Sequence, residues 1–418
     1  MKNCNRSDFV ITGLGITSAI GQGKKNFLAA LMNGCNYFDF MKRPGRQNLD
    51  SQFIGAEIES LNFADTFSKR LLRTASFSSQ VALVTLNEAW EEAKLASVDP
   101  RRIGLIIGGS NIQQREIMQT YEKYKDCPHH IRPNYAISFL DSDLCGICTE
   151  HFKIKGFAYT VGGASASGQL AILKGIEALE SGQVDICIVI GALMDLSYME
   201  FQALRAIGAM GSDMYFDKPE IACRPFDKNH NGFIYGENCG AVIIEKKEHA
   251  MERDITPYAT ISGWAINMDG NRQPNPSFEG EVLAIKETLE KAGLRAEDID
   301  YINPHGSGSI LGDETELKAI KYCGLSHAYI NSTKSITGHG LTAAGIVEFI
   351  TTILQIKESQ LHPTRNLENP IDESFNWIKN EPVYVDIKNA LNLSIGFGGM
   401  NTVSCLKKWN TSVEGEKL

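Results

Sequence analysis

Short apolar runs rich in Val and Ile alternate along the chain with longer amphipathic segments. Such short runs are typical of strands buried in a sheet, and the amphipathic segments are typical of helices that pack on it. The alternation therefore predicts an α/β fold. The best candidate strands are Phe9–Thr12, Ile103–Ile107, Ile186–Gly191, Ala241–Glu245, Ala259–Gly263, Tyr301–Asn303 and Leu393–Gly396.

Helices are predicted between these strands, where apolar residues recur at helical spacing. The sequence pattern changes at residues 248–256 (EHAMERDIT), between two predicted strands. This segment is the best candidate boundary between two halves. We expect an N-terminal half over 1–250, a C-terminal half over 251–408 and a polar tail over 409–418. The predicted helices are Lys24–Met32, Ser68–Leu95, Ser167–Ser181, Gly280–Ala292 and Thr342–Glu358.

Composition and charge narrow the class of protein. The 418 residues are 43% hydrophobic and 22% charged, as in ordinary globular proteins, and the formal net charge is -9. An acidic chain does not favour broad attraction to nucleic acid or to an anionic membrane. No apolar run approaches the roughly 18 residues that cross a bilayer. We therefore expect a cytoplasmic protein with no nucleic-acid and no membrane partner.

The ten cysteines are too scattered for a disulfide framework or a zinc module. Cys145 and Cys148 form a single CxxC with His151 nearby, but a second CxxC is missing. Their spacing on a predicted helix favours packing over metal binding or redox chemistry. We expect no metal site.

Three glycine-rich segments near the end of the chain carry candidate chemistry. HGSGS (305–309) follows a predicted strand, and KSITGH (334–339) precedes an Ala-rich helix that carries Glu348. GFGGMN (396–401) is a loop whose bare backbone can approach a ligand and offer N–H donors. Each segment alone is a weak signal, whereas their order and spacing together are specific.

These segments resemble those of the β-ketoacyl-acyl-carrier-protein synthases, or ketosynthases. VITGLGITSAIG at 10–21, the long block at 224–250, NPHGSGS, NSTKSITGHGLTAAG and GFGGMN are similar to ketosynthase blocks and occur in the family order. The resemblance spans nearly the whole chain. It implies the thiolase fold, a duplicated αβαβα five-layered sandwich, and a homodimer.

The resemblance also implies roles for single residues. His305 matches the histidine of the family's HGTGT block. Lys334 and His339 match the lysine and second histidine of the KSxxGH block, and Glu348 matches the acidic position on the following helix.

Further positions match supporting parts of the family site. Phe397 matches the loop residue whose backbone N–H helps to form an oxyanion hole, and Gly398 and Gly399 continue that loop. Ser307 and Ser309 stand where threonines are usual.

One block departs from the family pattern. Ketosynthases carry a nucleophilic cysteine in a segment like TACxSG, whereas this chain has Ser165 within GASASG (163–168). The flanking sequences fit the family on both sides, so no shift of the alignment places a cysteine there. A serine hydroxyl is a weak nucleophile unless a base is dedicated to it, so we expect Ser165 to accept acyl chains poorly.

Decarboxylation of a malonyl thioester needs donors to the thioester oxygen but no nucleophile. We therefore predict a malonyl-acyl-carrier-protein decarboxylase that yields the acetyl-carrier thioester. His305 and His339 would stabilise the enolate, and Lys334 would orient and tune His305. The backbone N–H groups of Ser165 and Phe397 would serve as oxyanion donors.

Stand-alone ketosynthase-like proteins with this replacement resemble the decarboxylases of polyketide β-branching cassettes. The implied partners are an acyl carrier protein, whose phosphopantetheine arm carries the substrate, and a hydroxymethylglutaryl-synthase-like enzyme that uses the acetyl unit. No other cofactor is expected. Lys69, Arg70 and Arg73 share a predicted helix and form a candidate docking patch for an acidic carrier protein.

Two other functions remain open at this point. A non-catalytic subunit like the chain-length factors would also lack the cysteine, although such proteins typically lose the histidines too. Alternatively, a histidine could activate Ser165 in a serine-dependent acyl transferase or condensing enzyme.

Overall fold

Twelve strands of the computed structural model, which describes residues 8–211 and 213–410, form one continuous mixed sheet. Its N-terminal strands follow the order β6-β5-β7-β9-β1, and its C-terminal strands continue as β10-β17-β16-β11-β12-β14. The twelfth strand, β2, lies off this path and pairs with β1. The bounds are β6 Ala158–Val161, β5 Ile103–Gly108, β7 Ile186–Gly191, β9 Asn238–Lys246, β1 Phe9–Ser18, β10 Ala259–Met268, β17 Met400–Lys408, β16 Asn389–Gly396, β11 Tyr301–Asn303, β12 Tyr329–Ile330 and β14 Asn376–Trp377.

The two sets of strands meet at β1 and β10, which pair antiparallel at the middle of the sheet. Each of these strands is shifted in register just before a glycine, Gly13 in β1 and Gly263 in β10. A Cβ at Gly13 would lie 2.6 Å from the carbonyl oxygen of Ala89, and one at Gly263 would lie 2.4 Å from that of Thr288. Both glycines therefore let a covering helix approach its strand in the same way, as expected for duplicated halves.

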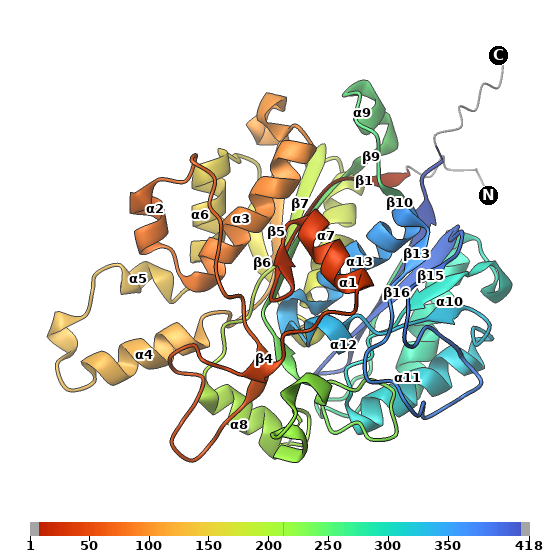
Figure 1. Ribbon diagram of the computed structural model, residues 1–418. Helices are drawn as coiled ribbons and strands as arrows, with labels where there is room; N and C mark the ends of the chain where they lie inside the picture. The colour runs from red at the N-terminus through yellow and green to blue at the C-terminus, as the bar shows by residue number, and fades with distance from the viewer. Residues whose placement is uncertain (1–7, 212, 411–418) are drawn as a thin grey trace.

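Helices cover the sheet in three layers (Figure 1). The helices α7 and α13 pack on each other between the two sets of strands, and their apolar residues belong to the central core. The outer face of the N-terminal strands is covered by α3 and α6, and that of the C-terminal strands by α10 and α11. The result is a five-layered αβαβα arrangement. The bounds are α7 Ser167–Glu180, α13 Ala344–Glu358, α3 Phe77–Glu92, α6 Ser142–Phe152, α10 Phe278–Ala292 and α11 Ile310–Tyr322.

Shorter elements surround these layers. The strands β3, β4 and β8 form a small separate sheet, whose strand β8 directly precedes β9 in the chain. The helices α4 and α5 project from one side (Figure 1). The bounds are β2 Gly21–Gln22, β3 Asp39–Phe40, β4 Ile54–Ala56, β8 Tyr235–Gly236, β13 Gln360–Leu361, β15 Val383–Tyr384, α1 Lys24–Met32, α2 Lys69–Thr74, α4 Gln114–Tyr124, α5 Tyr135–Ser138, α8 Tyr198–Ala206, α9 Lys247–Glu252 and α12 Lys334–Thr337.

The α/β prediction is confirmed, and each of the seven predicted strands is present. The single helix predicted over Ser68–Leu95 is wrong. The chain is extended at Ala75, and the side chain of Ser76 accepts a hydrogen bond from the backbone N–H of Ser79. This N-cap ends α2 and begins α3 as a separate helix.

The boundary predicted at residue 250 stays a prediction, and the tail from 411 to 418 lies outside the described residues. Within the ranges 8–211 and 213–410, no helix is long and apolar enough to span a membrane.

Candidate active site

Ser165 lies in a strained turn at the start of α7. The preceding residue, Ala164, has φ 48°, in the left-handed region that costs a residue with a Cβ about 1–2 kcal/mol. The turn leads through one 3-10 turn, Ala164–Ala166, into the N-terminus of α7. The partly buried Ser165 side chain is thereby presented to a cavity instead of to the core.

His339 contacts Ser165 from the other half of the chain. The distance from His339 Nε2 to Ser165 Oγ is 3.1 Å. The His339 backbone is held by β8 and its neighbour, because its N–H donates to the carbonyl of Ile234 and its carbonyl accepts from the N–H of Gly236. The position of the imidazole is therefore set by the sheet that carries β8.

The second histidine, His305, follows β11 and faces His339. Their ring centroids are 5.3 Å apart with the planes nearly perpendicular, at 78°. The ammonium of Lys334 lies 3.3 Å from His305 Nδ1 and also contacts the His305 carbonyl. Lys334 is buried and forms an ion pair with the buried carboxylate of Glu348. This pair compensates the charge of a lysine that would otherwise be costly to bury.

The hydrogen-bond pattern assigns one tautomer to both histidines. The backbone N–H of Leu341 donates to His339 Nδ1 over 3.1 Å, and Lys334 donates to His305 Nδ1. A nitrogen that accepts a hydrogen bond carries no proton, so each neutral ring carries its proton on Nε2. Burial lowers the pKa of both histidines well below its usual value, with the Lys334 charge acting in the same direction. Both rings are therefore neutral and present N–H donors.

Two carboxylates that the sequence analysis did not single out hold the His305 loop. Glu316 accepts hydrogen bonds from the backbone N–H groups of His305 and Gly306, at 2.5 and 2.8 Å. Asp313 accepts from the N–H groups of Gly308 and Phe226, at 3.0 and 2.6 Å. Both project from the first two turns of α11, and burial raises the pKa of Glu316 to about 8. Their spacing of three residues on one helix was the available signal.

The glycine-rich loop packs against the Ser165 turn. A Cβ at Gly396 would lie 2.1 Å from the carbonyl oxygen of Gly163, so only a glycine allows this approach. Phe397 follows and lines the cavity beside Ser165. Gly398 and Gly399 have φ of 89° and 85°, which turns the chain back into β17.

The structure therefore brings together most of the residues that the sequence singled out. The wall of the cavity includes Ser165, His305, His339, Ser307 and Phe397. Lys334 and Glu348 lie behind His305, where they are buried. The predicted roles of these residues remain predictions, whereas their proximity is a property of the structure.

The cavity has a volume of about 630 Å³, and its wall combines polar and apolar side chains. Ser165 and the two histidines are among the polar ones, and aliphatic side chains from α8 and its flanks cover much of the remaining wall. A thioester group can thus reach the N–H donors while water is largely displaced by apolar surface. The apolar part is lined by Met194, Leu196, Ala203, Leu204, Ile207 and Leu341.

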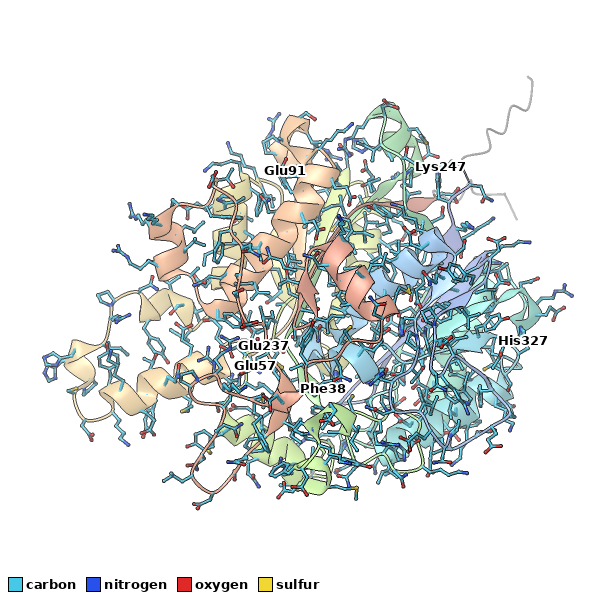
Figure 2. All side chains as sticks on the ribbon, in the orientation of Figure 1. Phe38, Glu57, Glu91, Glu237, Lys247 and His327 are labelled. Carbon is cyan, nitrogen blue, oxygen red and sulfur yellow. The ribbon has the colours of Figure 1, made fainter. Side chains whose placement is uncertain are left out.

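A buried arginine cluster supports the wall beneath His339. The guanidinium of Arg46 is fully buried and pairs with Glu237 at 2.6 Å, Asp195 at 2.8 Å and Glu57 at 3.3 Å. Figure 2 shows Glu57 and Glu237 next to each other beside β4. Arg46 also lies over the ring of Tyr235, which belongs to β8. Because β8 holds the backbone of His339, this charged cluster stiffens the support of the site.

The predicted docking patch lies away from the cavity wall. Lys69, Arg70 and Arg73 are exposed on α2, and none of them forms an ion pair with a residue in the described ranges. Figure 1 shows α2 on the outside of the N-terminal half. The patch is available for a partner, and its role stays a prediction.

Cys145 and Cys148 are buried in α6 against the core of the N-terminal half. Burial raises the pKa of Cys145 to about 11, so this thiol is not reactive. Across residues 8–211 and 213–410, no group of three or more His, Cys, Asp or Glu side chains is arranged to hold a metal ion.

Two family models together match most of the chain. The model of the β-ketoacyl synthase N-terminal domain matches residues 6–250, and that of the C-terminal domain matches residues 258–368. The chain belongs to the β-ketoacyl synthase family. This confirms the resemblance on which the sequence analysis relied, and with it the thiolase-like fold.

Individual relatives agree with the family. The chain is 62% identical, over 97% of its length and 98% of the relative's, to the polyketide biosynthesis malonyl-ACP decarboxylase PksF of Bacillus subtilis (strain 168). A β-ketoacyl synthase from Burkholderia phymatum STM815 superposes with a TM-score of 0.86 at 25% identity, covering 97% of this chain and 100% of that one. A type II PKS ketosynthase in complex with its acyl-carrier protein gives a TM-score of 0.82 at 25% identity, covering 96% and 100%.

Proposed function

We propose that this protein is a ketosynthase-like decarboxylase that converts malonyl-acyl-carrier-protein to acetyl-acyl-carrier-protein. The observation that carries the proposal is the pair of neutral histidines, His305 and His339, which lie close together and line one cavity with Ser165. The 62% identity to a protein named malonyl-ACP decarboxylase supports the same reaction.

The two imidazoles would act on the thioester oxygen. As the bond to the carboxylate breaks, its electron pair moves toward the carbonyl and negative charge gathers on that oxygen. Two fixed N–H donors in a poorly hydrated site stabilise this charge without reorganisation. Lys334 and Glu348 would keep His305 in the donor tautomer, and the backbone N–H groups of Ser165 and Phe397 would offer further donors.

The tautomer of His339 argues against a serine nucleophile. A base for Ser165 needs an unprotonated nitrogen facing the hydroxyl, whereas the nitrogen that faces it carries the proton. Ser165 therefore lacks a dedicated base. A non-catalytic partner subunit is also disfavoured, because a protein without a reaction has no need of two aligned donors and a buried lysine that orients one of them.

The partners follow from the same proposal. The substrate would arrive on the phosphopantetheine arm of an acyl carrier protein that docks at Lys69, Arg70 and Arg73. The acetyl product would pass to a hydroxymethylglutaryl-synthase-like enzyme that forms a β-branch on a polyketide. We also propose a homodimer, which sedimentation of the purified chain would test, and a cytoplasmic location.

The decisive experiment is to incubate the protein with malonyl-carrier protein and follow the mass of the carrier species. Conversion to the acetyl species is expected, and a malonyl species that stays intact would rule the function out. The double variant His305→Ala/His339→Ala serves as the control for spontaneous loss of CO₂. A stable acyl adduct on Ser165 in the intact-protein mass spectrum would instead support a serine-dependent transferase.

A further inference from the structure

Loss of CO₂ from a malonyl thioester leaves an enolate, and its terminal carbon must gain a proton to become an acetyl group. A condensing enzyme avoids this step because the carbon attacks an acyl group instead. We propose that the hydroxyl of Ser165 donates this proton. The inference rests on the proposed decarboxylation and assigns a chemical role to the serine.

The hydrogen bond between Ser165 and His339 leaves the serine proton available. Because His339 Nε2 carries the ring proton, the imidazole donates and Ser165 Oγ accepts over their 3.1 Å separation. Within residues 8–211 and 213–410, Ser165 Oγ has no second hydrogen-bond partner. Its own O–H is therefore free to turn toward a substrate in the cavity, whose wall Ser165 helps to form.

The reacting carbon would lie close to this hydroxyl. The thioester oxygen would bind the Nε2–H groups of His305 and His339, and the enolate carbon is two bonds away from that oxygen. His339 Nε2 is within hydrogen-bond distance of Ser165 Oγ, so one imidazole adjoins both the enolate oxygen and the serine. The enolate carbon, the enolate oxygen and the Ser165 hydroxyl would therefore lie close together in the cavity.

The surroundings also stabilise the alkoxide that proton donation leaves behind. Protonation of the enolate carbon restores a neutral thioester, whose oxygen no longer carries the negative charge. The His339 N–H can then donate to Ser165 Oγ instead. The 14-residue helix α7 begins two residues after Ser165, and the positive end of its dipole favours negative charge there. The charge thus moves from the enolate oxygen to a site already equipped with a donor.

The step balances without another reactant. The C–C bond to the carboxylate breaks and CO₂ leaves. The electron pair of the enolate forms the new C–H bond, the electron pair of the O–H bond stays on Ser165 Oγ, and the alkoxide regains a proton from solvent. One proton is consumed in total for each CO₂ released.

Four carboxyl groups also line the cavity, those of Glu200, Asp269, Asp313 and Glu316, and Asp269 is the rival donor because its Oδ2 is buried with no hydrogen-bond partner among the described residues. Both oxygens of Glu316 are occupied by the backbone N–H groups of His305 and Gly306, so the carboxyl faces the loop that it supports. Ser307, a second cavity-lining hydroxyl, accepts a hydrogen bond from the N–H of Ser309 and stands on that same loop. The control variant is therefore Ser97→Ala, at an exposed serine that does not line the cavity.

The test measures the discrimination between hydrogen and deuterium in the protonation step, which depends on the group that donates the proton. Malonyl-carrier protein is decarboxylated in an equal mixture of H₂O and D₂O, and the ratio of hydrogen to deuterium in the new acetyl group is read by mass spectrometry. We expect Ser165→Ala to change this ratio, because water then replaces the serine as donor, and to slow net turnover by about 10²-fold, as for loss of a general acid. Ser165→Thr, which keeps a hydroxyl, and Ser97→Ala should retain the wild-type ratio.

The outcomes separate this inference from the function on which it rests. If the wild-type protein releases no CO₂, the proposed function fails. If it releases CO₂ but the ratio is the same in wild type and Ser165→Ala, the decarboxylase stands and the serine is not the donor. Circular dichroism of Ser165→Ala checks that the turn and α7 still fold.

Discussion

A single backbone N–H decides the chemistry available to His339. Leu341, whose φ of 51° is rare for a residue with a side chain, directs its N–H to Nδ1 and so fixes the proton on Nε2. A histidine of the opposite tautomer would be a base for Ser165. The same two residue types therefore make either a nucleophile or a donor pair, and a neighbouring peptide bond determines which.

Removing one donor should leave a weak enzyme. His339→Ala is expected to lower kcat for decarboxylation by about 10²- to 10³-fold, because loss of one preorganised donor costs about 2.7–4 kcal/mol. The rate is measured as CO₂ released from malonyl-carrier protein. His327→Ala, at an exposed position labelled in Figure 2 and outside the cavity, should keep the wild-type rate. Equal loss in the two variants would contradict a role for the His339 N–H.

The protonation state of the histidines can be observed directly. Burial lowers the pKa of His305 and His339, so the neutral form should persist as the pH falls through 6.5, the usual value. Nitrogen NMR of histidine-labelled protein is expected to show both rings neutral, with the proton on Nε2, at pH 6. Titration of either ring near pH 6.5 would contradict the donor assignment.

Among single residues, the sequence predicted the side chains that line the site better than the side chains that support its loops. The three glycine-rich segments pointed to His305, Lys334 and His339, because glycine next to a strand end exposes its neighbours. Glu316 was missed as a site residue, because a carboxylate on a helix that carries other charges is usually solvated. Only the packed structure shows it buried under the loop.

The division between α2 and α3 shows that the spacing of apolar residues is not enough to place the end of a helix. Helical spacing of apolar residues continues across Ser76, so periodicity alone predicts one long helix. The N-cap hydrogen bond and the extended backbone at Ala75 override it. Strand centres were predicted well, whereas β1 and β10 extend several residues further than their apolar runs, because the middle of the sheet pairs on both sides.

The cap of α3 should matter for stability. Ser76→Ala is expected to lower the free energy of unfolding by about 0.5–2 kcal/mol, because the buried start of α3 loses its N-cap. Thermal unfolding of the purified variant measures the effect. Ser68→Ala removes the corresponding cap of α2, a helix with no buried residues, and should cost less. A larger effect at Ser68 would contradict this account.

The whole molecule presents an acidic surface with a local cationic patch. Reversing Lys69, Arg70 and Arg73 to glutamate should raise the apparent KM for malonyl-carrier protein roughly tenfold, equivalent to about 1.4 kcal/mol. A small malonyl thioester should be turned over as before. Steady-state kinetics with both substrates makes the comparison.

The control for the patch lies on the other half. Lys286→Glu changes the charge of an exposed residue on α10, which Figure 1 places across the molecule from α2. It should leave both substrates unaffected. Equal loss on the carrier-bound and the small substrate in the triple variant would show damage to the fold instead of lost docking.

The alternation of strands and helices predicted the α/β class, and the resemblance to the family blocks implied the duplicated halves. The geometry of the site could not be anticipated, since no pattern encodes the distance between Ser165 and residues far along the chain. Their meeting depends on α7 and α13 packing together between the two sets of strands.

Because of that packing, the site is complete only when the two halves of the chain are packed together. Ser165 precedes β10 in the chain, whereas His305, Lys334 and His339 follow it. If the chain were cut between α9 and β10, neither fragment would hold a complete set of groups, and activity would return only when the fragments reassociate. Turnover would then rise with the product of the two fragment concentrations, so catalysis itself would measure their assembly.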